Sequence, residues 1–217
     1  MSSAREEVLN RVRAAKGNPT TVPIRRDYRH TDPRPHDQLV ALFCERVADY
    51  RAEVERVGAD QLRAAIGAAA ERHDARRLAV PPQLPDGWRP PGLELLGDDG
   101  LTACALDALD GVITGCTVAI AETGTIALSA GLREGRRLLS LVPDLHICVV
   151  AGGQIVGTVP EAITSLGSVV RDSRRPVTLI SGPSATSDIE LQRVEGVHGP
   201  RRLVVLVVDE SLTEEST

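Results

Sequence analysis

The chain has 217 residues, enough for one full domain with a small appendage and a sizeable core. Hydrophobic residues make up 42% of it but aromatic residues only 2%, so the core must be built from Val, Leu, Ile and Ala. The formal charge of −5 and the scarcity of aromatic side chains argue against a nucleic-acid partner, which requires a basic face or base-stacking surfaces. Lys16, the single lysine, lies in a polar segment, and this disfavours Schiff-base chemistry.

Targeting segments and cofactor motifs are not evident. No apolar run is long enough to cross a bilayer and the N-terminus carries acids, so we expect a cytoplasmic protein without a membrane span. Neither GxGxxG nor GxxxxGKS/T occurs, and the cysteines are scattered without a CxxC pair. We therefore expect no cofactor and no metal in this chain. The cysteines are Cys44, Cys104, Cys116 and Cys148.

The N-terminal part of the chain is predicted to be helical. A helix over residues 3–15 is followed by a loop, rich in proline and arginine, that extends to residue 35. Apolar residues from Val40 to Val57 recur at three- and four-residue steps with charges between them, which predicts a helix over residues 40–57. We expect this helix to pack on its own domain, the alternative being a seam between subunits. Another helix is predicted over residues 59–73.

From residue 78 onward, short apolar strands alternate with helices and turns. Helices are predicted over 101–109 and 160–167, and strands over 78–80, 93–96, 118–121, 125–128, 147–150, 177–180 and 203–208. The last three strands are apolar throughout, which is typical of strands buried on both faces, and strands 118–121 and 125–128 are expected to form a hairpin.

This alternation predicts an α/β fold, with a mixed, largely parallel sheet flanked by helices and additional N-terminal helices. We expect three parts: an N-terminal helix and arm (1–35), an α/β domain (36–210) and a polar tail (211–217).

The richest candidate site is the segment 181–202, SGPSATSDIELQRVEGVHGPRR. It follows strand 177–180, so we expect it at the carboxyl end of a strand, where open α/β sheets place their ligands. Gly182 permits a tight backbone path, and Ser184 and Thr186 supply hydroxyl groups for an anion. Asp188 is a candidate acid or base and Glu190 a candidate binding residue. The alternative is a turn that caps the next element.

Basic side chains lie within or near this segment. His198, between glycine-containing turns, is suited to proton transfer or carboxylate binding, unless it only bonds the backbone of its turn. Arg136 and Arg201 belong to arginine pairs and could clamp a carboxylate or phosphate through bidentate hydrogen bonds. Most paired surface arginines are merely solvated.

Two further candidate positions precede that segment. Glu122 lies at the tip of the predicted hairpin and is a candidate acid, base or nucleophile, with a binding or structural role as the alternative. Thr125 follows it as a candidate binding residue. Asp144 and His146 precede strand 147–150, at the end opposite the expected ligands of a parallel sheet. This position favours a structural turn, and His146 is kept as a secondary binding candidate.

Three segments carry a resemblance to a known family. They are residues 111–131 (GVITGCTVAIAETGTIALSAG), 138–150 (LLSLVPDLHICVV) and 181–202. They resemble the LUD-domain family, the lactate-utilisation proteins of the C-subunit type, and the resemblance covers nearly the whole chain. It implies the fold of the superfamily that includes ribose-5-phosphate isomerase, glucosamine-6-phosphate deaminase and the CoA transferases. In CoA transferases a glutamate beside a glycine-containing turn is the nucleophile, which implies that role for Glu122.

The resemblance also implies a function. It is that of the cluster-free subunit of a bacterial L-lactate utilisation system, which oxidises lactate to pyruvate and whose partner subunits carry the iron–sulfur clusters. The chain would bind a small carboxylate or other small anion and help to assemble the complex, and it could also form a homo-oligomer. One alternative is a free-standing enzyme acting on a small anion through Glu122 or Asp188, with His198 assisting. The other is a scaffold with a vestigial pocket. Side chains supply no electron acceptor, which favours the subunit.

Overall fold

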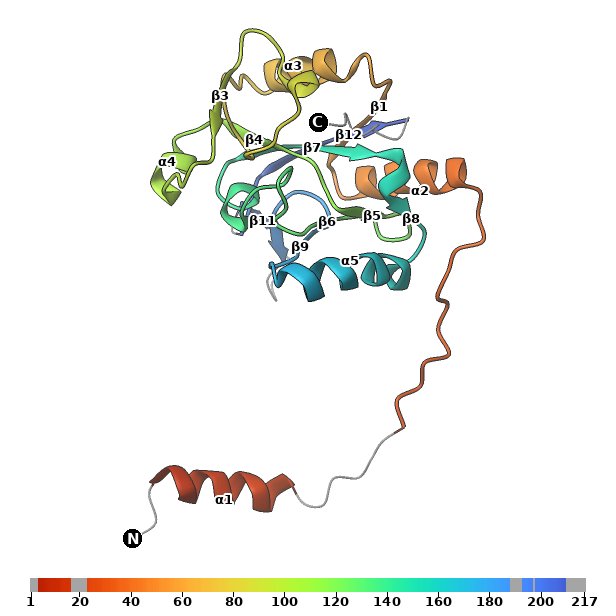
Figure 1. Ribbon diagram of the computed structural model, residues 1–217, viewed down its shortest axis with the longest axis vertical. Helices are drawn as coiled ribbons and strands as arrows, with labels where there is room; N and C mark the ends of the chain where they lie inside the picture. Colours follow the sequence, from red (N-terminus) through yellow and green to blue (C-terminus); the bar gives the residue numbers. More distant parts are fainter. Residues whose placement is uncertain (1–3, 17–22, 188–192, 197, 210–217) are drawn as a thin grey trace.

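The fold is built around a six-stranded sheet in which every pair of neighbouring strands is parallel (Figure 1). The computed structural model describes residues 4–16, 23–187, 193–196 and 198–209, and the side chains of 185–187 and 193–195 are not described. In spatial order the strands are β1 (Glu53–Val57), β12 (Arg202–Val208), β7 (Leu145–Ala151), β4 (Gly111–Thr114), β2 (Arg77–Val80) and β3 (Glu94–Gly97). The central strands β12, β7 and β4 are almost entirely buried, because both faces of this sheet are covered.

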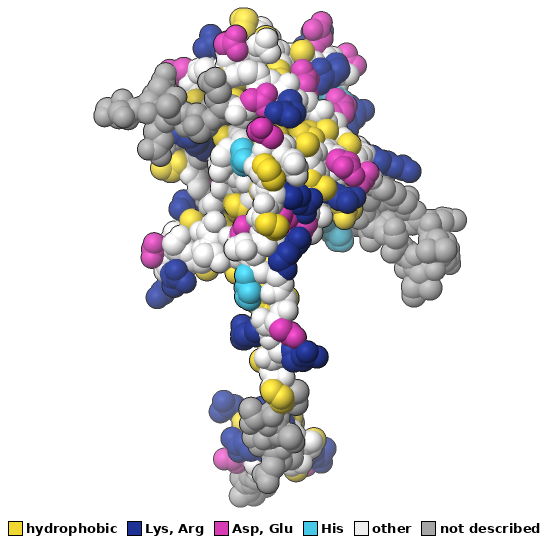
Figure 2. All heavy atoms as spheres, turned by 90° about the vertical axis from the view of Figure 1, so that its right-hand side faces the viewer, with side chains coloured by type: hydrophobic (Ala, Val, Ile, Leu, Met, Phe, Trp, Pro, Cys, Tyr) yellow, Lys and Arg dark blue, Asp and Glu magenta, His cyan; other side chains and the backbone are white. Residues whose placement is uncertain are grey.

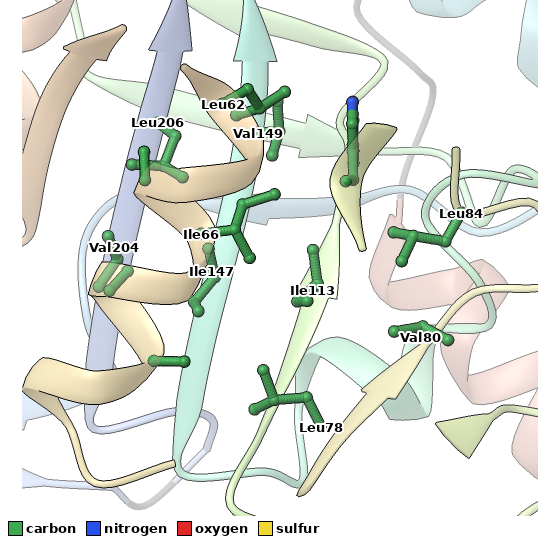
Figure 3. Close-up of a cluster of buried hydrophobic side chains, with 14 of the residues drawn as sticks. Leu62, Ile66, Leu78, Val80, Leu84, Ile113, Ile147, Val149, Val204 and Leu206 are labelled. Carbon is green, nitrogen blue, oxygen red and sulfur yellow. The ribbon is translucent and has the colours of Figure 1, made fainter. Parts of the chain in front are cut away.

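One face of this main sheet is covered by α3 (Leu62–Arg72). Leu62 and Ile66 of the helix point onto the sheet, where they meet Ile147, Val204 and Leu206 (Figure 3). Successive strand residues point to opposite faces, so the intervening residues of β7 and β12 face the other side.

The second face packs against α2 (His36–Asp49) and against a second sheet. The second sheet has the order β8-β5-β6-β9: β8 (Ile155–Val156), β5 (Val118–Ile120), β6 (Thr125–Leu128) and β9 (Thr178–Ile180). The outer side of the second sheet is covered by α5 (Val159–Ser173), through Ala162 and Leu166. The layers are therefore α3, the main sheet, α2 with the second sheet, and α5.

Short elements and one separate helix complete the described chain. The helix α1 (Ala4–Lys16) has no buried residue and lies apart from the domain at the end of an extended arm, which Figure 2 shows as a narrow column of atoms. No helix of the described residues is both long and apolar enough to span a membrane. The short elements are α4 (Ala103–Asp107), the 3-10 turns η1 (Asp86–Trp88), η2 (Arg137–Ser140) and η3 (Gly152–Gln154), and a hairpin of β10 (Ala185–Ser187) with β11 (Arg193–Glu195).

The α/β class and the largely parallel sheet are confirmed, and so is the antiparallel pairing of residues 118–120 with 125–127. The helix predicted over residues 40–57 is wrong in its second half. The helix ends at Asp49, Arg51 adopts a left-handed conformation with φ of 65°, and Val54 and Val57 lie in β1. Valine suits a strand as well as a helix, and the pairing of β1 with β12 lies too far away in the sequence for a local pattern to reveal it.

The strand predicted at residues 177–180 exists but lies elsewhere in the fold. It is β9, the edge strand of the second sheet, where it pairs antiparallel with β6. Its residues are half-buried or exposed rather than buried on both faces. This difference decides where the serine-rich segment after it lies.

Candidate functional site

A cavity of about 210 Å³ opens between the segment 178–184, the turn 198–200 and the main sheet. Its floor includes His146 and Leu203, each the second residue of its parallel strand. The cavity therefore lies at the amino ends of β7 and β12. The expected position at the carboxyl end of a sheet strand is wrong for the main sheet, because β9 belongs to the second sheet and delivers its loop to the opposite edge.

The loop after β9 follows a path that requires glycine. Gly182 has a φ of 88°, in the left-handed region that favours glycine, and a Cβ placed there would lie 2.5 Å from Cβ of Tyr50. Tyr50 is the C-cap residue of α2, so the C-terminal end of α2 supports this loop. Ser181, Gly182, Pro183 and Ser184 all line the cavity.

Ser184 connects the loop to the histidine turn by three hydrogen bonds. Its backbone N–H donates to the carbonyl oxygen of Pro200 at 2.8 Å, and its carbonyl oxygen accepts from the N–H of Gly196 at 3.0 Å. Its Oγ accepts from the N–H of His198 at 3.1 Å. Since the Oγ is already an acceptor, and its own proton has no acceptor among the described residues, this hydroxyl is available to donate into the cavity.

Ser181 ends a row of three hydroxyl groups. Thr123 Oγ1 lies 2.7 Å from Thr125 Oγ1, which lies 2.8 Å from Ser181 Oγ. Three hydroxyls that share two hydrogen bonds leave one proton without an acceptor in the described part of the chain. When Thr123 donates to Thr125 and Thr125 donates to Ser181, the hydroxyl proton of Ser181 is the one without an acceptor. Ser181 is then a second donor beside Ser184. Thr125, predicted as a binding residue, therefore orients Ser181 instead of lining the cavity.

His146 is the buried polar group of the site. Its side chain is 1% exposed, and its Nε2 lies 2.7 Å from Thr114 Oγ1, across the main sheet on β4. Its Nδ1 is buried and finds no partner among the described residues. Burial lowers the pKa of His146 to about 4, so the ring is neutral at pH 7.

A second, wider hollow of about 510 Å³ adjoins the cavity and shares Leu141, His198 and Gly199 with it. Arg137 and Arg201 line this hollow, and Arg201 Nη1 lies 3.1 Å from Asp144 Oδ2. The ion pair between Arg201 and Asp144 is half-exposed and therefore weak, so an incoming anion can replace Asp144 beside Arg201 at little cost. His198, which lines both the cavity and the hollow, and Arg201, which lines the hollow, are both predicted from the sequence.

Other predicted residues lie elsewhere. Glu122 does not line the cavity: its Oε2 is 2.5 Å from Arg29, and its Oε1 accepts from the N–H of Val159 at 3.2 Å. Arg136 forms a bidentate ion pair with Asp98, with both contacts at 2.7 Å, so its guanidinium is already engaged.

Three predictions fall in segments that the structure describes only in part or not at all. The backbone of Thr186 lies in β10, but its side chain is not described. Asp188 and Glu190 lie outside the described residues. The roles assigned to these residues, and to Glu122, stay predictions.

A buried carboxylate that the sequence did not single out lies at the opposite edge of the main sheet. Glu134 is 5% exposed, and its Oε2 accepts from the N–H groups of Ser129 at 2.5 Å and Gly131 at 3.0 Å. Its Oε1 accepts from the hydroxyl of Thr117. Glu134 stands in the charged run GLREGRR, where no local pattern separates a buried acid from a solvated one.

The described residues offer no group of three His, Cys, Asp or Glu side chains that could hold a metal ion. Burial raises the pKa of the Cys148 thiol to about 12 and also raises the pKa of Cys116 well above its usual value. Both thiols are therefore protonated at neutral pH. The chemistry that the site offers is hydrogen-bond donation from hydroxyls beside a neutral imidazole and two guanidinium groups.

Fold and site together define an α/β protein with a parallel main sheet and a small polar cavity at its amino edge. The profile of the LUD domain matches residues 104–208. Lactate utilization protein C of Deinococcus radiodurans is 49% identical over 177 residues, which cover 81% of this chain and 82% of that one. Lactate utilization protein C of an Exiguobacterium species is 30% identical over 224 residues, 94% of this chain and 95% of its own.

A solved structure supports the same family assignment. The crystal structure of a DUF162 family protein from Deinococcus radiodurans superposes with a TM-score of 0.72 at 41% identity, over 82% of this chain and 100% of that one. The chain belongs to the LUD-domain family. The family resemblance predicted from segments 111–131, 138–150 and 181–202 is thereby confirmed.

Proposed function

We propose that the chain is the cluster-free subunit of a bacterial L-lactate utilisation system, in which it binds the small carboxylate and helps to assemble the complex. The names of its relatives, Lactate utilization protein C, support the pathway. The cavity at the amino edge of the main sheet supports the binding role. Partner subunits are expected to carry the iron–sulfur clusters that accept electrons from lactate, while this chain holds no cofactor of its own.

The observation that carries the proposal is the pair of hydroxyl groups in the cavity. Ser184 Oγ accepts a hydrogen bond and has its own proton to donate to a ligand, and Ser181 Oγ supplies a second proton when Thr125 donates to it. Hydroxyl donors suit the oxygens of a carboxylate, since a hydrogen bond to a charged group contributes about 1.5–3 kcal/mol. The volume of about 210 Å³ lies below the roughly 300–1,000 Å³ of cavities for drug-sized ligands, and therefore fits an acid of a few carbon atoms.

Further groups at the site suit a small monoanion. Arg201 and Arg137 line the adjoining hollow, so their guanidinium groups attract a carboxylate toward the cavity. The neutral ring of His146 lies in the floor without a formal charge. An uncharged floor beneath hydroxyl donors favours a small monoanion over a multiply charged phosphate.

The contacts of Glu122 weigh against the alternative of a free-standing enzyme. A carboxylate nucleophile or base needs an unshared oxygen facing its substrate. Both oxygens of Glu122 already have partners, in Arg29 and in the first turn of α5, and the residue does not line the cavity.

The binding proposal is tested by calorimetric titration of the purified chain with L-lactate and with pyruvate. We expect saturable one-site binding of at least one of them. The double variant Ser181→Ala/Ser184→Ala should weaken it at least about 100-fold, because two hydrogen bonds to a charged group are lost. The matched control is Thr164→Ala/Ser168→Ala, which removes two exposed hydroxyls that bond only within α5. Absence of binding to the wild-type chain, or unchanged affinity in the serine variant, would contradict the proposal.

The assembly proposal needs a separate experiment in the native host. We expect an affinity-tagged chain to co-purify with cluster-bearing subunits whose iron and sulfide can be assayed, and deletion to abolish growth on L-lactate alone. Unimpaired growth of the deletion strain on L-lactate would contradict the pathway assignment, whatever the outcome of the calorimetry.

A further inference from the structure

The N-terminal helix α1 exposes an apolar stripe. Val8, Val12 and Leu9 are 60%, 56% and 38% exposed, and none of the 13 residues of the helix is buried. At 100° per residue these three side chains lie on one side of the helix. An isolated helix shorter than about 12–15 residues is only marginally stable in water, so α1 needs a surface to pack on.

A matching apolar surface lies on the outermost layer of the domain, at the end nearer to α1 in Figure 1. Val159, Ile163 and Val170 of α5 are 39%, 57% and 40% exposed and lie within about 40° of one another around the helix. Leu179 of β9 is 58% exposed and pairs with Ala127, which packs beneath α5, so Leu179 lies on the same side of the second sheet. We call these four residues the α5–β9 surface.

This surface holds most of the exposed large apolar side chains of the domain. Outside α1 and the arm, the described residues add only Tyr50 and Leu132 to the four. An apolar surface gathered on one helix and one edge strand, and not scattered, is typical of a site where another protein segment docks.

The charges of the two helices are complementary when they run antiparallel. α1 begins with the acidic residues Glu6 and Glu7 and ends with Arg13 and Lys16. α5 has Glu161 in its first turn and ends with the basic run that includes Arg171. Antiparallel packing brings opposite charges together at both ends and also aligns the helix dipoles favourably.

The path of the arm determines which α5–β9 surface α1 can reach, that of its own chain or that of another copy. The carbonyl oxygen of His30 accepts from the hydroxyl of Thr158, and Arg29 pairs with Glu122, so the arm is fixed at the N-terminus of α5. From there it leads away from the domain, and α1 stands clear of its own α5 (Figures 1 and 2). A helix held out in this way is placed to reach another molecule.

We propose that α1 of one copy docks antiparallel on the α5–β9 surface of a second copy, with the two copies exchanging their helices reciprocally. Two-fold symmetry gives the dimer two identical contacts between α1 and the α5–β9 surface. Each contact therefore needs to bury only about 600 Å² for the dimer to reach the roughly 1,200 Å² of a stable interface.

Sedimentation of the full chain over a range of concentrations tests the exchange. We expect a dimer of twice the 23.2 kDa chain mass. Val8→Asp/Val12→Asp and Ile163→Asp/Val170→Asp should each weaken dimerisation at least 100-fold. The matched controls Asn10→Asp/Ala14→Asp and Thr164→Asp/Ser168→Asp add the same charges to other faces of the two helices, and should remain dimers.

Mixing the two defective variants distinguishes exchange between copies from docking within one copy. The first variant keeps an intact α5–β9 surface and the second an intact α1, so a mixed dimer retains one good contact. We expect the labelled variants to associate with each other more tightly than either associates with itself. A monomeric wild-type chain, a dimer that survives Val8→Asp/Val12→Asp, or a mixture with no preferential association would each overturn the proposal.

Discussion

The two edges of the main sheet differ in how completely their polar groups are satisfied. At the carboxyl edge, Glu134 accepts from two backbone N–H groups and from the hydroxyls of Ser129 and Thr117, and Gln154 bonds the backbone of Cys116 and Ala151. At the amino edge, Ser184 Oγ has no described acceptor for its proton, Ser181 Oγ shares a single hydrogen bond with Thr125, and Nδ1 of His146 has no described partner. One edge is closed by its own loops and the other is open.

In the proposed assignment, the ligand site follows polar groups without protein partners rather than a fixed end of the strands. Open α/β sheets usually bind at the carboxyl ends. Here the loop that contains Glu134 fills that end, with the carbonyl oxygen of Arg133 accepting from the N–H of Gly115 after β4. The second sheet then brings a serine-rich loop from its edge strand β9 to the amino ends of β7 and β12.

The largest effect on stability is expected at the closed edge. Glu134→Gln keeps one oxygen for the N–H groups of Ser129 and Gly131 when its NH2 faces the hydroxyl of Thr117, but it replaces hydrogen bonds to a charged acceptor with bonds to a neutral one that are each about 1 kcal/mol weaker. We expect a loss of about 3 kcal/mol in the free energy of unfolding, measured by urea denaturation.

The exposed control Glu71→Gln should change that free energy by less than about 0.5 kcal/mol. Ligand affinity of the folded Glu134→Gln molecules should stay unchanged, because Glu134 lies at the other edge. A stable variant that has lost binding would reverse the assignment of the two edges.

The next effect is a pH dependence at the open edge. The pKa of His146 is about 4 in the folded chain against 6.5 ordinarily, so between these values the unfolded chain binds more protons. Stability therefore falls as the pH drops through this window, by about 2 kcal/mol between pH 7 and pH 5. His146→Gln should remove this part of the slope in urea denaturation at the two pH values. His198→Gln, at an exposed ring, should leave it intact, and identical slopes in all three proteins would be inconsistent with a buried neutral His146.

A smaller effect is expected from a structural carboxylate at the open edge. Asp110 Oδ2 accepts from the N–H groups of Arg76 and Arg77, both at 2.8 Å, and these bonds lower the pKa of its carboxyl group. Asp110→Ala should cost about 1 kcal/mol at pH 7, because Asp110 is exposed and water replaces part of what is lost. The difference should diminish only below pH 3.8, as the carboxyl group protonates. The exposed control Asp99→Ala should have little effect, and a cost as large as that of Glu134→Gln would contradict the contrast between the edges.

Local sequence patterns predicted much of the fold. The apolar strands that became β7 and β12, the hairpin of β5 with β6, and the helices α1, α3 and α5 all show a period or a turn that is visible within a few residues. The boundary between α2 and β1 was missed, because Val54 continues the helical spacing while Arg51 has already turned the chain. The pairing that makes β1 a strand is with β12, at the other end of the sequence.

The site was predicted in part. The glycines, serines and histidine of segment 181–202 were visible, and the structure brings Gly182, Ser184 and His198 to one cavity. The sequence makes His146 only a secondary candidate, because it stands at the amino end of its strand; its place in the cavity depends on topology rather than on local sequence. Ser181 opens the candidate segment but is not among its predicted binding residues, and Glu134 lies outside it; each acquires its role from partners such as Thr125 and Ser129.

The measurement that tests the central claim most directly is a crystal structure of the chain soaked with L-lactate. The account predicts a bound carboxylate at the amino edge, with its oxygens within hydrogen-bonding distance of Ser181 Oγ and Ser184 Oγ. It also predicts that no ligand lies near Glu134. A carboxylate bound at the carboxyl edge, or an empty cavity at saturating L-lactate, would contradict it.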